Sequence, residues 1–64
     1  MQEDMNRRLE LLRIEHRDLD TAIVALVANT VPDHMAIARL KKRKLRLRDE
    51  MLWIEDQLIP DIIA

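Results

Sequence analysis

The chain has 64 residues, with no cysteine, no glycine and 36% charged residues. A chain of this length makes one domain with a small core, and the absence of cysteine excludes disulfides and thiolate metal sites as supplements to it. The formal net charge of −1 excludes a long-range attraction of the whole molecule to nucleic acid or acidic membranes. We therefore expect association with another copy to supply the missing stability.

The composition predicts an all-α protein, because Leu, Ile, Ala, Arg, Glu and Asp dominate while strand and tight-turn residues are scarce. The N-terminal stretch MQEDMNRRLELLRIEH is charged from its third residue and lacks the apolar region of a signal sequence. The longest apolar run, AIVALVA at residues 22–28, is far shorter than the ~20 residues that a bilayer requires. These features predict a soluble, intracellular protein without a membrane span.

A first helix is predicted at about residues 3–28. Its apolar positions follow one another at alternating steps of four and three, which is the pattern of a heptad seam. The seam positions are Met5, Leu9, Leu12, His16, Leu19, Ile23 and Leu26. His16 is the one polar residue among them.

A turn is predicted at about residues 29–33, and a second helix at about residues 34–59. Asn29 tolerates the left-handed conformation that ends many helices, and Asp33 after Pro32 is a good N-cap. The second helix has its own seam at Ile37, Leu40, Lys44, Leu47, Met51, Ile54 and Leu58. Pro60 ends or kinks this helix and leaves the apolar tail DIIA. So short a turn predicts an antiparallel two-helix hairpin, a single domain over residues 1–64.

The two seams match in one antiparallel register, in which facing residues have numbers that add up to about 63. Ile23 then faces Leu40, and Leu9 faces Ile54. The same register places the basic segment 39–48 beside the acidic residues of 15–24, and the acidic segment 49–56 beside Arg7, Arg8 and Arg13. Exposed ion pairs contribute about 0 to 1 kcal/mol each, so we expect them to set register more than stability.

The basic segment is the most conspicuous candidate for binding. Besides Lys44 it contains Arg39, Lys41, Lys42, Arg43, Arg46 and Arg48, which point around most of the helix. It contains no aromatic residue or glycine for base stacking or close backbone approach. We favour a solvated, partly ion-paired surface, and leave nucleic acid, a protein or an anionic lipid as alternative partners.

The second helix carries more apolar surface than one partner helix covers. Leu45, Leu52 and Ile59 form an additional row with Trp53 next to it, and Leu11 and Ile14 are the corresponding extra residues of the first helix. A lone hairpin would leave these side chains in water. We therefore predict a homo-oligomer, either a dimer that forms a four-helix bundle or a higher assembly.

His16, Asp20 and Lys44 come to one level in this register and form a polar cluster in the seam. Half of a metal site, or a carboxylate-oriented proton carrier, is one interpretation. The favoured one is a polar contact, with His16 paired to Asp20, that reduces stability but specifies the pairing of the helices.

Catalysis is not expected. The chain has no cysteine and no serine, and Thr21 and Thr30 are its two hydroxyl nucleophile candidates. The carboxylates in Asp49-Glu50 and Glu55-Asp56 are adjacent in sequence and diverge around a helix, so they do not pair as acid and base. We predict a non-enzymatic protein without a cofactor or metal.

Leu12, Glu15-His16-Arg17, Leu19-Asp20 and Ile23, followed by Asp33 and by LKKRKLRLRD at residues 40–49, resemble the YdcH-like family of small bacterial proteins, a domain of unknown function. The resemblance covers about residues 9–55, with Arg48 where the family typically has lysine. It implies a cytoplasmic, bacterial helical hairpin and suggests that His16, Asp20, Lys44 and Asp49 belong to the family's signature, without assigning them a chemistry.

Two functions follow as hypotheses. The first is a small helical interaction or adaptor protein that self-associates and offers a helical surface to an unknown protein partner. The second is a small nucleic-acid-binding protein that uses the basic segment 39–48.

Overall fold

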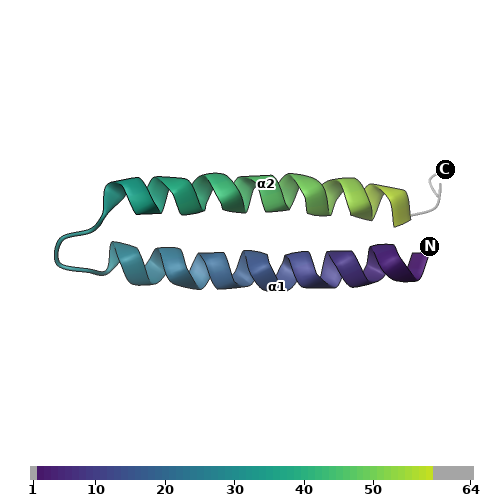
Figure 1. Cartoon of the computed structure of the whole chain (residues 1–64), viewed down its shortest axis with the longest axis horizontal. Coiled ribbons are helices and arrows are strands. Elements are labelled where there is room, and N and C mark those ends of the chain that lie inside the picture. Colours follow the sequence, from purple (N-terminus) through teal and green to yellow (C-terminus); the bar gives the residue numbers. More distant parts are fainter. Residues whose placement is uncertain (1, 59–64) are drawn as a thin grey trace.

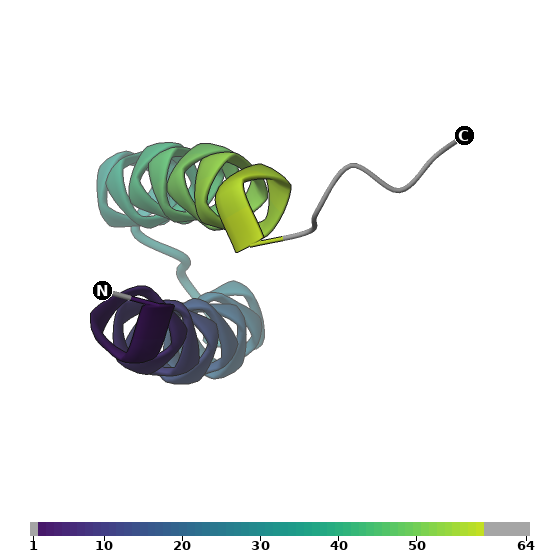
Figure 2. The same ribbon diagram turned by 90° about the vertical axis from the view of Figure 1, so that its right-hand side faces the viewer.

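The computed structural model of the chain describes residues 2–58, which form two α-helices and no strand. Helix α1 spans Gln2–Val27 and helix α2 spans His34–Leu58. They lie side by side in opposite directions, so that the start of α1 and the end of α2 are at the same end of the molecule (Figure 1). Viewed end on, they form a single pair (Figure 2). The predicted all-α fold of two helices packed on each other is confirmed.

Both helices consist of strong helix formers. Neither contains glycine or proline, and Leu and Arg are frequent in both. At about 1.5 Å per residue each helix is about 38 Å long. Neither described helix contains an apolar stretch long enough to pass through a bilayer.

The two helix ends at the turn are closed in different ways, and α1 is closed by backbone hydrogen bonds. At the end of α1 the Ala28 N–H donates to the Val24 carbonyl at 3.1 Å, and the Asn29 N–H donates to the Leu26 carbonyl at 3.3 Å. The second bond closes a tighter turn, which ends the helix without a left-handed residue. No described residue has a positive φ, so the left-handed cap expected at Asn29 is not formed.

Asp33 caps the start of α2. Its Oδ1 accepts a hydrogen bond from the Ala36 N–H at 3.0 Å, which satisfies one of the amide groups that a helix leaves open at its first turn. The predicted N-cap is confirmed. Two other predictions, the helix end or kink at Pro60 and the apolar tail that follows it, lie outside the described residues.

The core of the hairpin lies along the predicted seam. Within residues 2–58, every buried hydrophobic side chain is a seam position: Leu9, Leu12, Ile23, Ile37, Leu47 and Ile54. Leu9, Leu12, Leu47 and Ile54 form one cluster, against which Met5, Leu19, Met51 and Leu58 pack. The alternating steps of four and three therefore predicted the contact surface of both helices correctly.

Candidate functional site

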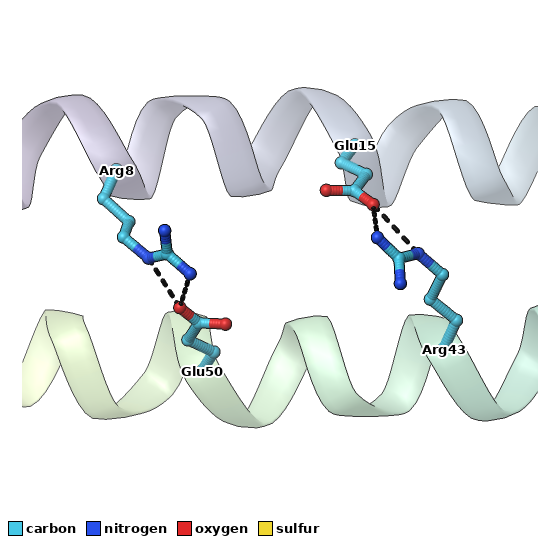
Figure 3. A network of polar contacts seen from close by, with 4 residues as sticks. All are labelled: Arg8, Glu15, Arg43 and Glu50. Carbon is cyan, nitrogen blue, oxygen red and sulfur yellow. Dashed lines mark hydrogen bonds and ion pairs between the residues drawn. The ribbon is translucent and has the colours of Figure 1, made fainter.

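Ion pairs between the helices follow one edge of the seam (Figure 3). The Arg8 Nε donates to the Glu50 Oε2 at 2.6 Å, and the Arg43 Nε donates to the Glu15 Oε2 at 3.0 Å. A second guanidinium nitrogen of each arginine contacts the same carboxylate oxygen. Glu15 lies one heptad after Arg8 on α1, and Arg43 lies one heptad before Glu50 on α2. The pairs therefore match only in the antiparallel register.

The opposite edge carries two further pairs. Arg13 contacts Glu55 at 3.2 Å, and the Lys44 ammonium contacts the Asp20 carboxylate. These four pairs confirm the predicted matching of charge blocks. The arginine side chains are more than half exposed, so each arginine pair contributes no more than about 1 kcal/mol. Their main effect is on the orientation and register of the helices.

The polar cluster of the seam consists of His16, Asp20 and Lys44. The hydrogen bond from Lys44 holds the pKa of the Asp20 carboxyl below its usual value of 3.8. Partial loss of hydration opposes this effect, while the charges of Lys44 and His16 reinforce it. Within residues 2–58 the His16 imidazole makes no hydrogen bond to Asp20. The carboxylate is bound by the Lys44 ammonium of the other helix instead.

The contact between Asp20 and Lys44 explains how a lysine can occupy a seam position. The Lys44 side chain is about one third exposed, and the carboxylate lies where its ammonium leaves the seam. A long aliphatic stem packs along the seam while its charged end stays near water. Over the described part of the chain, no three His, Asp or Glu side chains gather as a metal site requires.

A groove of about 590 Å³ opens beside this cluster, on the edge of the seam that carries Lys44. His16 of α1 lines it together with residues of α2. Of these, Lys41, Leu45, Arg48, Leu52 and Glu55 recur at alternating steps of four and three, and Lys44 and Met51 lie beside them on the seam. Lys41 lies at one end of the groove and Glu55 at the other. Sequence reasoning missed the groove, although the steps from Lys41 to Glu55 trace its wall along one face of α2.

The residues predicted for an oligomer interface are divided between two places. Leu45 and Leu52 line the groove and are 59% and 54% exposed. Trp53 is 59% exposed and lines a separate hollow with Arg8 and Glu50, on the edge shown in Figure 3. Ile59, the last predicted member of the row, lies outside the described residues. Within residues 2–58, the apolar lining that α2 gives the groove consists of Leu45, Leu52 and the half-buried Met51.

The basic residues also lie on two sides of α2. Lys41, Lys44 and Arg48 line the groove. A hollow of about 360 Å³ on the other side is lined by Arg39, Lys42, Arg43 and Arg46, together with Arg8 of α1. Of the seven bases at 39–48, Arg43 and Lys44 are the two that form ion pairs within the described residues. Bases that form no ion pair within the described residues are therefore present on both sides of α2.

A comparison with protein-family models matches residues 9–55 to a family described as "Protein of unknown function (DUF465)". Searches of the curated proteins and of the solved structures each gave no match.

Proposed function

We propose that this chain, which belongs to the YdcH-like family DUF465, acts as a non-enzymatic helical interaction module. The module associates with copies of itself and presents a helical surface to a protein partner. The observation that carries this proposal is the exposed pair Leu45 and Leu52 in the groove beside α2.

The size of the hairpin core supports this proposal. Six hydrophobic side chains of the described hairpin are buried, and none of its side chains falls below 2% exposure. A protein of this size buries about 60% of the surface that its unfolded chain exposes, which leaves small stability. Natural proteins in this size range commonly gain the remainder from metals, disulfides or association. Association is the route that this sequence leaves open.

The groove supplies apolar surface for such an association. Full burial of a leucine side chain stabilises by about 1.5 to 3 kcal/mol, and Leu45 and Leu52 each still expose about half of theirs. Covering them in a partner therefore contributes about 1 kcal/mol per leucine. A symmetric dimer covers four such leucines, about 4 kcal/mol in total, which by itself corresponds to a weak, reversible association.

Sedimentation equilibrium from micromolar to millimolar protein tests the proposal. We expect the average mass to rise to that of a dimer or a larger oligomer, and the Leu45→Ala/Leu52→Ala variant to shift that rise to higher concentration. Val31→Ala is the matched control, because Val31 is 84% exposed but lies in the turn. A folded monomer at every concentration would overturn the proposal.

The non-enzymatic part of the proposal rests on the residues available for chemistry. Thr21 and Thr30 are the candidate hydroxyl nucleophiles. The Thr21 hydroxyl donates to the Arg17 carbonyl of its own helix at 3.2 Å, which is a local helix contact. The Asp20 carboxylate is bound by Lys44, so it is not held ready as a proton acceptor.

The basic hollow favours a second candidate function, the binding of nucleic acid. Arg39, Lys42 and Arg46 line it without forming ion pairs within the described residues. Phosphate contacts release counterions, so log K should fall with log salt by about 0.9 per contact on duplex DNA. Titration of duplex and single-stranded oligonucleotides with wild type and Arg39→Glu/Arg46→Glu checks this. Equal, salt-independent signals from both proteins would exclude the function.

A further inference from the structure

The charge of α2 reverses sign in the middle of the helix. Residues 39–48 contain seven basic side chains and no acidic one, whereas residues 49–56 contain four acidic side chains and no basic one. Such a helix is complementary to an antiparallel copy of itself, because each basic half then lies beside an acidic half. In a parallel copy, like charges lie beside one another.

The apolar row of the groove has the same midpoint. Leu45 lies on the basic half of α2 and Leu52 on the acidic half, one heptad apart, with the reversal between Arg48 and Asp49 midway between them. A twofold axis at this midpoint would place Leu45 of one copy against Leu52 of the other. The apolar contacts and the charges therefore specify the same arrangement.

We infer that the occupant of the groove is helix α2 of a second copy of this chain, which runs antiparallel to the first about a twofold axis near residues 48 and 49. This inference rests on the proposed self-association and adds the surface, the orientation and the register. The interface is isologous, since the same patch is used by both copies.

The ends of the groove agree with this arrangement. Lys41 and Glu55 lie at opposite ends, so Lys41 of one copy comes to the level of Glu55 of the second copy. Lys42 lines the basic hollow but also borders the groove, because it lies three residues before Leu45, and residues at this spacing are neighbours on a helix surface. Asp56, four residues after Leu52, borders the groove in the same way, so Lys42 of one copy comes to the level of Asp56 of the second copy. Lys42 and Asp56 are exposed and form no ion pair within the described hairpin.

Helix α1 is a poorer occupant of the groove. Its large exposed apolar residues are Leu11, Ile14, Val24 and Val27, and no two of them lie one heptad apart, so they do not form a row. Its charges alternate along residues 7–20 and do not form two blocks of opposite sign. A copy of α1 would therefore bring like charges to the groove at several levels, in either direction.

Cysteine cross-linking tests the orientation directly, because the natural chain has no cysteine. The experiment oxidises Leu45→Cys protein, Leu52→Cys protein and an equimolar mixture of the two, and measures the disulfide-linked dimer of each. We expect the mixture to cross-link and each variant alone to remain largely unlinked. In the inferred dimer, identical positions are displaced by one heptad, about 10 Å along the helix, which exceeds the ~7 Å that a disulfide spans between Cα atoms.

The outcomes separate the inference from the proposed function. Cross-linking of each variant with itself would show a parallel arrangement and overturn the inference, although self-association would stand. Absence of cross-links in a protein that sediments as a dimer would overturn the groove as the interface. A monomer in sedimentation would overturn the proposed function as well.

Charge reversal provides a second measurement, which does not depend on the leucines. Lys42→Glu and Asp56→Lys each place like charges together twice in the dimer, so we expect each to weaken dimerisation by about 3- to 10-fold at low salt. The double variant should recover the wild-type dissociation constant. Arg7→Glu on α1 is the control, with the same change of charge. Circular dichroism verifies that each hairpin remains helical, and equal dissociation constants for all variants would overturn the inference.

Discussion

Leu45 and Leu47 lie two positions apart on α2 and have opposite environments. Leu47 is 7% exposed and belongs to the core cluster, whereas Leu45 is 59% exposed and lines the groove. Replacing each by alanine removes the same atoms from the same helix. The pair of variants therefore separates the stability of the hairpin from the stability of the proposed dimer.

The expected magnitudes follow from these exposures. Replacing a buried leucine by alanine costs about 2 to 5 kcal/mol, and we expect about 2 kcal/mol at Leu47 because a seam between only two helices can close partly around the loss. For a domain of this size that lowers Tm by about 10 °C. Leu45→Ala leaves the isolated hairpin almost unchanged, because alanine has at least as high a helix propensity as leucine.

Thermal unfolding followed by circular dichroism, at several protein concentrations, distinguishes the two effects. Leu47→Ala should lower Tm at every concentration. Leu45→Ala should reduce the increase of Tm with concentration, since ligand-like stabilisation by a second copy depends on mass action. The reasoning would be refuted if Leu45→Ala lowered Tm as much as Leu47→Ala in the most dilute samples, or if Leu47→Ala had no effect.

Three further outcomes are expected. Asp33→Ala should cost about 1 kcal/mol of unfolding free energy by removing the N-cap of α2, as measured by urea denaturation. Glu15→Lys should lower Tm by a few degrees at low salt by facing Arg43, and adding Arg43→Glu should restore it. Because its pKa is lowered in the folded state, the Asp20 carboxylate should stabilise the hairpin above pH 3.8 and lose this effect as the pH falls below that value. Asp20→Asn should therefore reduce the change of the unfolding free energy with pH in that range.

The sequence predicted the seam accurately because one physical rule governs it. Apolar residues at steps of four and three face one side of a helix, and two such rows bury each other. The six side chains that are buried in the described part of the chain all lie at predicted seam positions for this reason. The cap at Asp33 was predictable on equally local grounds, since it depends on a side chain and an amide three residues away.

Contacts for which a side chain has more than one possible partner, and hollows formed by two helices together, were not predictable in the same way. Asp20 can reach either His16 on its own helix or Lys44 on the other, and the structure selects Lys44. The groove depends on how the faces of two helices combine, so no single-helix pattern displays it. Trp53 follows Leu52 directly, but consecutive residues point about 100° apart around a helix, which places Trp53 in a different hollow.

The reversal of charge in α2 favours an antiparallel neighbour in two places, namely α1 within the hairpin and, in the proposed dimer, α2 of a second copy. Within the hairpin, its bases meet acids of the second half of α1 and its acids meet arginines of the first half, which makes the antiparallel register the favourable one. Charges that point away from α1 keep the same order along the helix. They therefore present a second copy with the same preference for an antiparallel neighbour. Contacts of this protein with itself account for Arg43 and Lys44 within the hairpin and, in the proposed dimer, for the bases beside the groove. Arg39 and Arg46 lie on the side away from the groove, and they are the bases for which a different partner is proposed.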